Sequence, residues 1–273
     1  MKTLAAICIV KNEEKHIKCA LNSVKGLANE IIVVDSGSTD NTLNIAKQFT
    51  DKIYTNSWPG YGPQKNFAVS KTNCDFVLQI DADEEVTPDL AKEIKSILSQ
   101  PKFDYYWLGI VTEFIGRPLK HLSGNNLRLF NRSAAQWDDK KIHEQVIKKE
   151  NGYPVKYSSV DSGKLSSKLL HHSHYQTLTD YKKRQEKYTS ADAEEMLKTG
   201  KDRIGKDVKV QSKNIFSVWF FLYERALKQF IKKLFLHKGL LDGWQGWLWC
   251  FLSAQYEYKM CKKYLKLKNN NAK

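Results

Sequence analysis

The sequence has 273 residues, of which 41% are hydrophobic and 27% are charged, and its formal net charge is +14. This composition is typical of a globular protein and excludes a largely disordered chain. No run of about 18 apolar residues occurs, so we expect no single helix to span a bilayer.

Short apolar runs alternate with helical patterns in the first half of the chain. Strands are predicted at residues 4–10, 30–35, 75–80, 105–112 and 126–130. Helices are predicted at residues 13–24, 39–49, 63–70 and 88–98. The run IIVVD is almost entirely β-branched, as is typical of a strand covered on both faces. The alternation predicts an α/β fold with a mixed, mostly parallel sheet and helices on both faces.

The second half of the chain has a different pattern. Residues 132–175 lack clear periodicity, and they contain most of the histidines. Residues 178–200 are typical of a helix that ends at Gly200, and the polar residues 201–214 predict a loop. From Leu241 onward, mostly apolar residues recur every three or four positions. This spacing predicts a long helix with one apolar face. The members of this apolar stripe are Leu241, Trp244, Leu248, Phe251, Gln255, Tyr258, Cys261 and Leu265.

The cysteines and the N-terminus favour an intracellular protein. The five cysteines form no C-x-x-C pair, and we expect reduced thiols that mostly fill the core. The first apolar run ends at Val10 and meets charged residues without a small-residue cleavage site. We therefore expect a first strand there rather than a signal peptide.

A cluster of carboxylates follows the strand predicted at 75–80, namely Asp81, Asp83, Glu84 and Glu85. Ligands of open α/β sheets bind beyond the carboxyl ends of the strands. In an extended stretch Asp81 and Asp83 would face the same side, where a divalent cation would offset their repulsion. Carboxylate oxygens suit Mg²⁺ or Mn²⁺, and the small Ala82 allows a ligand to approach the backbone. A solvated turn before the helix at Pro88 remains an alternative.

Two other residues are candidates for binding a nucleotide. Asp35 ends the second predicted strand, where a carboxylate could bind ribose hydroxyls or a base edge, or could simply cap its own turn. Lys65 lies in GPQKNFA near a predicted helix start, where it could contact a phosphate or remain a solvated surface lysine.

Four stretches together resemble the donor half of family 2 glycosyltransferases, which are inverting enzymes of the Rossmann-like GT-A fold. They are ICIVKNEEKHIKCALNSV, EIIVVDSGSTDNT, GPQKNFA and DFVLQIDADEEVTPDL. Three later stretches resemble the subgroup of lipopolysaccharide inner-core β-1,4-glucosyltransferases, which add glucose to a heptose. They are HEQV, LLHHSHYQTLTDYKKRQEKYT and LHKGLLDGWQGWLWCFLSAQYEYKMCKKY.

The resemblance implies a GT-A catalytic domain at 1–212, with a nucleotide-sugar-binding half at 1–100 and an acceptor half at 101–212. A basic, aromatic, helical region would follow at 213–273. The expected activity is metal-dependent transfer of a hexose, with glucose from UDP-glucose as the expected donor. A transferase of another surface glycan, or a non-catalytic binding module of the same fold, is the alternative.

The resemblance also implies residue roles in donor binding. Asp35 would contact the uridine, Asp81 would lie near the ribose, and Asp83 would bind the Mg²⁺ or Mn²⁺ that bridges the two phosphates. The same pocket would also be lined by Asn12, Glu13 and Lys65. Apart from the resemblance, Arg128 in NNLRLFN is a candidate to pair with a phosphate of the donor or acceptor, or with an acidic neighbour.

Inverting transfer needs a general base for the acceptor hydroxyl. An acidic residue in this region commonly serves as the base in the family, so we expect Glu144 of KKIHEQV to be the base. His143 is the alternative, because an imidazole titrates near neutrality, and a plain surface pair is the third interpretation.

The histidines of LLHHSH are candidates for a further metal ligand. Strand alternation puts His172 and His171 on opposite sides, which argues against a three-histidine zinc site, and no cysteine is near in the sequence. His172 is predicted to ligate the Asp83 metal together with Asp81, or else to be structural.

The C-terminal region is strongly basic. Residues 225–273 hold 11 Lys or Arg against two acidic residues, so +9 of the +14 lies there. Lysines beside tryptophans and an apolar face are typical of an element in the interface of an anionic membrane. Packing on the protein's own core and a homodimer contact are the alternatives, and nucleic acid is not expected. We expect a cytoplasmic protein, peripheral on the inner face of the bacterial inner membrane, with a lipid-linked oligosaccharide acceptor.

Overall fold

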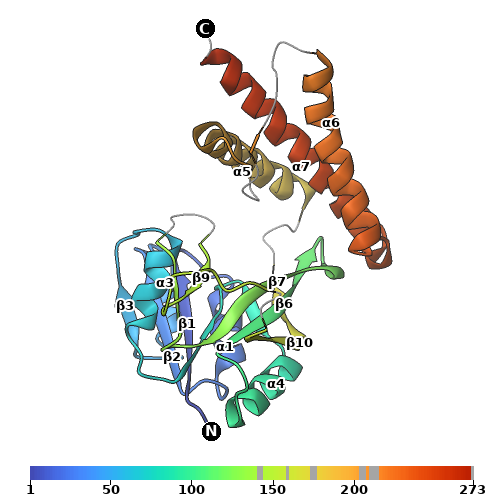
Figure 1. The fold of residues 1–273 in the computed structure, drawn as a ribbon. Coiled ribbons are helices and arrows are strands. Elements are labelled where there is room, and N and C mark those ends of the chain that lie inside the picture. Colours follow the sequence, from blue (N-terminus) through green and yellow to red (C-terminus); the bar gives the residue numbers. More distant parts are fainter. Residues whose placement is uncertain (140–143, 158–159, 173–176, 203–206, 209–214, 272–273) are drawn as a thin grey trace. The chain divides into compact units, whose positions relative to one another are not determined.

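The computed structural model divides the chain into two compact units (Figure 1). The sheet unit comprises Met1–Val111 and Ser123–His172, and the helical unit comprises Thr112–Leu122 and Ser173–Lys273. The structure describes residues 1–139, 144–157, 160–172, 177–202, 207–208 and 215–271.

An eight-stranded sheet forms the centre of the sheet unit, in the order β3-β2-β1-β4-β7-β6-β10-β5. Its first half is parallel. Strand β1 (Leu4–Val10) lies between β2 (Glu30–Asp35) and β4 (Phe76–Gln79), and β3 (Ile53–Thr55) pairs with β2. Because these strands run in one direction, the loops that follow them meet at one edge of the sheet.

The other half of the sheet contains antiparallel pairs. Strand β7 (Arg117–Asn131) pairs with β4, and β6 (Tyr105–Phe114) lies beside β7. Strand β10 (Ser162–His171) follows, and the short β5 (Glu84–Val86) pairs with it antiparallel. A separate ribbon is formed by β8 (Ala135–Trp137) and β9 (Val146–Lys148).

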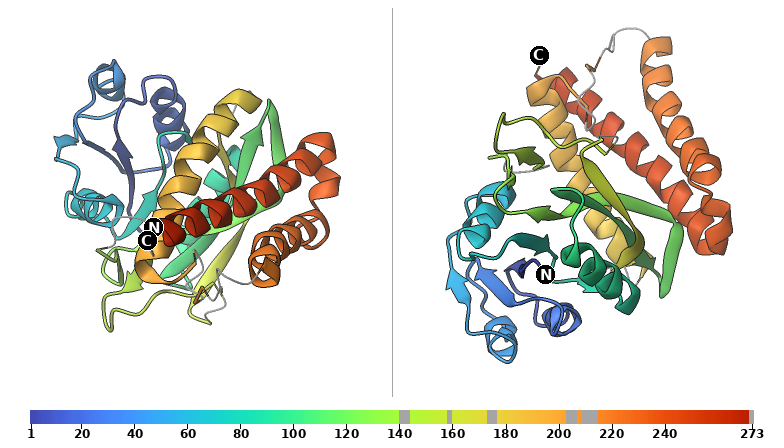
Figure 2. Two further views of the ribbon diagram at one scale, coloured as in Figure 1. Left: turned by 90° about the horizontal axis from the view of Figure 1, so that it is seen from above. Right: turned by 60° about the horizontal axis from the view of Figure 1, so that its bottom comes forward.

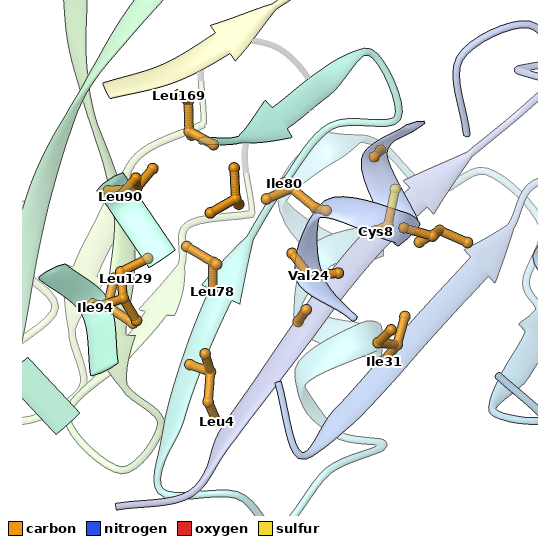
Figure 3. Close-up of a cluster of buried hydrophobic side chains, with 14 of the residues drawn as sticks. Leu4, Cys8, Val24, Ile31, Leu78, Ile80, Leu90, Ile94, Leu129 and Leu169 are labelled. Atoms are coloured by element: carbon orange, nitrogen blue, oxygen red, sulfur yellow. The ribbon is translucent and has the colours of Figure 1, made fainter. Parts of the chain in front are cut away.

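Helices cover both faces of the parallel strands. On one face, α1 (Ile17–Val24) and α4 (Pro88–Ser99) bury their apolar sides on alternate residues of the strands, as Leu4, Cys8 and Leu78 show (Figure 3). The other face of β1 packs with α3 (Tyr61–Val69). The short α2 (Thr42–Ala46) adds Ala46 to the first cluster. Burial of these two apolar layers is the main force that holds the strand ends in place.

The helical unit is built on α5 (Leu178–Thr199), α6 (Ile215–Ile231) and α7 (Gly243–Asn270). Two short turns join α6 to α7, η1 (Lys232–Leu236) and η2 (Gly239–Asp242). Helices α6 and α7 lie side by side, and α7 also packs on α5 (Figure 2). In the described part of the chain, no helix combines the length and apolarity needed to cross a bilayer.

The predicted fold class is confirmed. The sheet is mixed, helices cover both of its faces, and further helices follow at the C-terminus. The predicted helix at 178–200 is also confirmed: Thr177 and Asp180 form a capping box at its start, and Gly200 ends it in the left-handed conformation.

Some details of the prediction are wrong: α2 is shorter than the predicted 39–49, and β7 is longer than the predicted 126–130. Helix α1 begins at Ile17 rather than at Glu13, because the preceding residues form the loop at the strand edge. The apolar stripe predicted for the last helix is not one continuous surface. Cys261 and Leu265 are buried in the helical unit, whereas Leu241 and Trp244 are exposed. The predicted boundary at residue 212, between a catalytic domain and a C-terminal helical region, remains a prediction.

Candidate active site

The loops after β1, β2 and β4 meet at one edge of the sheet. The last residue of β1, Val10, pairs with Asp35, the last residue of β2. On the other side of β1, Ile7 pairs with Gln79 at the end of β4. This register brings the acidic turn that follows β4 to the same edge as Asp35, as the sequence predicts for a ligand site.

Asp35 is buried and caps the turn that follows it. Its carboxylate accepts hydrogen bonds from the backbone N–H of Gly37 at 2.9 Å and of Ser38 at 3.0 Å, and from the Ser38 hydroxyl. Gly37 has a φ of +91°, where a side chain would be strained. The turn role that the sequence left open is therefore present, and contact with uridine remains a prediction.

Asn12 and Glu13 bind the same turn. The Asn12 side chain accepts a hydrogen bond from the Thr39 N–H at 2.8 Å. The backbone N–H of Asn12 donates to the Ser38 hydroxyl at 2.9 Å. The Glu13 N–H donates to the Thr42 hydroxyl at 2.7 Å. These bonds fix the β1 and β2 loops against each other and leave the predicted contacts of Asn12 and Glu13 with the donor untested.

A buried arginine organises the acidic turn after β4. Arg128 of β7 donates to Asp81 at 2.7 Å and to Glu84 at 2.6 Å. Burial acts to raise the pKa of Asp81, but the charges of Arg128 and Lys65 outweigh it and lower that pKa. Burial raises the pKa of Glu84 to about 7 despite Arg128. The sequence left a phosphate or an acidic neighbour as possible partners of Arg128. In the structure Arg128 pairs with the acidic neighbours Asp81 and Glu84.

The segment from Asp81 to Glu84 is a turn, so the expectation of an extended stretch is wrong. The Glu84 N–H donates to the Asp81 carbonyl at 3.0 Å, and the Ala82 side chain is buried in the core. Asp81 therefore contacts Arg128, whereas the Asp83 carboxylate lies 3.1 Å from Nε2 of His171.

The two histidines at the end of β10 have different partners. Burial acts to lower the pKa of His171, but its hydrogen bond to Asp83 and the charge of Asp83 outweigh it and raise that pKa. The His172 backbone N–H donates to the Asp83 carbonyl at 2.8 Å, while its ring lies 2.8 Å from Glu85. Among the described residues, His171 rather than the predicted His172 thus contacts the Asp83 carboxylate.

Lys65 and Glu144 form a second charged pair at this edge. Lys65 Nζ on α3 lies 2.6 Å from Glu144 Oε1, and both side chains are largely buried. The Trp137 ring lies 5.6 Å from the Lys65 ammonium. The neighbouring Gln64 donates to the Ser36 hydroxyl at 2.9 Å, which ties this part of α3 to the loop after β2. The charge of Lys65 also lowers the pKa of Asp81 in the acidic turn. His143 lies outside the described residues.

The donor set at Asp83 and His171 suits a divalent metal. A carboxylate and an imidazole already converge at 3.1 Å, and oxygen with nitrogen ligation is compatible with Mn²⁺. The Arg128 Nε is buried without a hydrogen-bond partner among the described residues. Its N–H group is therefore still available to donate a hydrogen bond to a bound ligand.

The sequence pattern does not reveal the contacts that His171 and Glu84 make in the structure. His171 pairs with Glu84 in the antiparallel register of β10 and β5, and that register decides which histidine ring faces Asp83. The only sequence signals for these residues were their positions in LLHHSH and DADEE, which do not reveal this pairing.

Comparison with known proteins identifies the family to which this part of the chain belongs. The model of the family described as "Glycosyl transferase family 2" matches residues 6–148, which contain the strand edge, the acidic turn and Glu144. An uncharacterised glycosyltransferase of Rickettsia typhi is 46% identical over 106 residues. This match covers 39% of the chain and only 36% of that relative.

A longer match is to the lipopolysaccharide core biosynthesis glycosyltransferase LpsC of Rhizobium meliloti, which is 27% identical over 72% of this chain and 73% of LpsC. Among solved structures, TarS of S. aureus matches with a TM-score of 0.47 at 14% identity, over 92% of this chain and 55% of TarS.

Glucosyl-3-phosphoglycerate synthase of Mycobacterium tuberculosis, solved with Mg²⁺ and UDP, matches with a TM-score of 0.37 at 21% identity. This match covers 49% of this chain and 59% of that structure. The family match extends over more than half of the chain, and the chain belongs to glycosyl transferase family 2.

Proposed function

We propose that this protein is a metal-dependent inverting glycosyltransferase that moves glucose from UDP-glucose to a heptose of a lipopolysaccharide inner core. The observation that carries the proposal is the meeting of two charged groups at one strand edge, the Asp83–His171 pair and the Lys65–Glu144 pair. The family supports sugar transfer, and the name of the LpsC relative supports a lipopolysaccharide core acceptor.

Asp83 and His171 would hold Mg²⁺ or Mn²⁺, with Asp81 beside them. When bound, the metal would supply positive charge that stabilises the leaving diphosphate. Arg128 keeps Asp81 ionised and oriented through its 2.7 Å bond, and it also binds Glu84. The chain thus holds its carboxylates in place before a donor binds, which lowers the cost of forming the site.

Glu144 would remove the proton from the acceptor hydroxyl. In this structure Glu144 Oε1 is occupied by the Lys65 ammonium at 2.6 Å, so this contact must open before an acceptor hydroxyl can take its place. We therefore expect Lys65 to turn from Glu144 to a donor phosphate when the nucleotide sugar binds. Donor binding would then release the base, so that the acceptor is activated only when a donor is present.

The acceptor is expected to be lipid-linked, because the helical unit has an extensive exposed apolar surface. On α6, exposed apolar residues recur every three or four positions, so they lie on one face of the helix. The surface continues through the α6–α7 connection onto α7. We call it the α6–α7 surface, and it consists of Phe216, Trp219, Phe220, Tyr223, Leu227, Ile231, Phe235, Leu236, Leu240, Leu241, Trp244, Trp247 and Phe251.

An anionic membrane surface is the partner that this chemistry fits. The exposed Lys228, Lys232 and Lys238 lie among the apolar residues, and cations beside tryptophan and phenylalanine suit lipid headgroups above acyl chains. Each lysine near such a surface contributes about 1 kcal/mol to binding. A homodimer through the same surface is the competing outcome, and it would bury these lysines against like charge.

The transfer reaction is tested by the release of UDP from UDP-glucose in the presence of Mn²⁺. We expect slow release without acceptor, faster release with heptose-terminated core lipid, and a loss of at least 100-fold in Asp83→Ala. Asp89→Ala, which removes an exposed carboxylate from nearby α4, is the matched control. Unchanged release in Asp83→Ala would refute the metal assignment. Binding of UDP without turnover on any acceptor would favour the non-catalytic alternative.

A further inference from the structure

A second group of potential metal ligands lies next to the acidic turn and is not used by the proposed reaction. Cys19, Glu85 and His172 each offer one ligand atom, and these three atoms lie within 4.8 Å of one another. The Cys19 Sγ lies 3.3 Å from Glu85 Oε2 and 3.9 Å from His172 Nε2, and His172 Nε2 lies 2.8 Å from the same carboxylate oxygen. No sequence pattern indicates this group, because Cys19 is 153 positions from His172.

These distances are close to the ligand spacing of a tetrahedral zinc ion, although two of them differ from it by a few tenths of an ångström. Zinc bonds of about 2.3 Å to sulfur and about 2.0–2.2 Å to nitrogen or oxygen place ligand atoms about 3.3–3.6 Å apart. The three atoms would need to move by only about half an ångström to meet that geometry. We propose that Cys19, Glu85 and His172 form a zinc site.

The three ligands come from elements that are already tied together. Cys19 lies on the outer side of α1, whose inner side is buried in the core through Ile17 and Leu21. The Ser23 hydroxyl of α1 accepts a hydrogen bond from the Val86 N–H of β5 at 3.0 Å. The antiparallel register of β5 and β10 pairs Glu85 with Leu170, two positions before His172, and the His172 ring reaches Glu85 at 2.8 Å. The ligands are therefore held in place by rigid elements, as an effective metal site requires.

The ligand types favour zinc over the metals expected at Asp83. A thiolate with an imidazole and a carboxylate suits Zn²⁺, whereas Mg²⁺ prefers oxygen ligands alone. Cys19 is the one exposed cysteine of the five, and the other four are buried. Its thiol is thus accessible to a metal, and the other cysteines do not compete for it.

A zinc ion here would fasten α1 to β5 and β10, immediately beside the turn that carries Asp83. Its role would be structural and would not depend on the proposed transfer reaction. Because zinc would bind the folded protein and not the unfolded chain, it would stabilise the folded state. We expect saturating zinc to raise the midpoint of thermal unfolding by about 5 °C or more.

Cobalt titration of the full chain tests the proposal, because a cobalt–thiolate bond gives a near-ultraviolet charge-transfer band that oxygen and nitrogen ligands do not give. We expect one band that saturates at about one Co²⁺ per chain and disappears when Zn²⁺ is added. Cys19→Ser should abolish the band. His172→Ala and Glu85→Gln should weaken cobalt binding at least about tenfold.

Two controls separate this site from others. His237→Ala removes an exposed histidine from the helical unit and should leave the band unchanged. Asp83→Ala should also retain the band, because the thiolate site is distinct from the diphosphate metal site. Cys19 is exposed, so its replacement should not prevent folding, which circular dichroism checks. The proposal is overturned if the wild type gives no band, or if the band survives Cys19→Ser.

Discussion

Lys65 and Glu144 form a largely buried ion pair, 2.6 Å from Nζ to Oε1, that joins α3 to the segment before β9. The pair places the expected base of the reaction against a cation that a donor phosphate can attract. This relationship makes the roles of both residues testable through separate measurements of activity and stability.

Replacement of the expected base should affect turnover more than donor binding. We expect Glu144→Gln to lower kcat by about 10²–10⁴-fold, because proton transfer from the acceptor loses its base. The KM for UDP-glucose should change little. Steady-state kinetics at saturating acceptor measures both values. Glu150→Gln, at an exposed position close in sequence, is the control and should retain normal turnover. A wild-type kcat in Glu144→Gln would transfer the base role to another group, such as His143.

The same ion pair should contribute to stability in a non-additive way. Lys65→Met leaves Glu144 largely buried without its partner, which should lower the free energy of unfolding by about 3–5 kcal/mol. The double variant Lys65→Met/Glu144→Gln removes both charges and should be more stable than Lys65→Met alone. Urea unfolding of the wild type and the three variants gives the coupling energy. Additive effects of the two substitutions would show that the pair is not formed in solution.

Glu93 should stabilise the protein in a pH-dependent manner. Its carboxylate on α4 accepts hydrogen bonds from the N–H groups of Ser166 at 2.9 Å and Ser167 at 2.8 Å on β10. Burial acts to raise the pKa of Glu93, but these hydrogen bonds outweigh it and lower the pKa from its ordinary 4.5. A lowered folded-state pKa means that the stabilisation is present above pH 4.5 and is lost as the pH falls through the folded-state pKa.

Glu93→Gln should therefore lower the free energy of unfolding by about 1–2 kcal/mol at pH 7, and by much less at low pH. Chemical denaturation across this pH range measures the difference. Asp51→Asn, at an exposed position, is the control. A constant difference between Glu93→Gln and the wild type at every pH would contradict the assignment.

The α6–α7 surface should bind anionic lipid. We expect the protein to float with vesicles that contain phosphatidylglycerol, and to do so much less with neutral vesicles or at high salt. Phe216→Ser combined with Trp219→Ser should reduce flotation, because these side chains are 84% and 60% exposed. Tyr153→Ser, an exposed position in the sheet unit, is the control. A stable dimer in light scattering that does not bind vesicles would instead assign this surface to self-association.

The sequence predicted the parts of the fold that depend on local patterns. The bounds predicted for β1 and β2 agree with the structure, since continuous apolar runs such as IIVVD end at a charged residue. Helix α4 begins at Pro88 as predicted, and the Thr87 side chain caps it by accepting a hydrogen bond from the Leu90 N–H.

Features that depend on distant pairing were not predictable. Strands β5 and β10 have few long apolar residues, so neither shows a clear strand pattern, and they are defined by their mutual hydrogen bonds. That pairing sets His171 against Asp83 and His172 against Glu85. Cys19 joins the second group only because α1 packs beside β5.

The most direct test of the central claim is the position of the metal in crystals grown with Mn²⁺ and UDP, located by the anomalous scattering of manganese. Our account predicts a peak within bonding distance of the Asp83 carboxylate and the His171 imidazole, with the UDP phosphates on its other side. A manganese ion bound elsewhere, or UDP bound with no metal at Asp83, would contradict it.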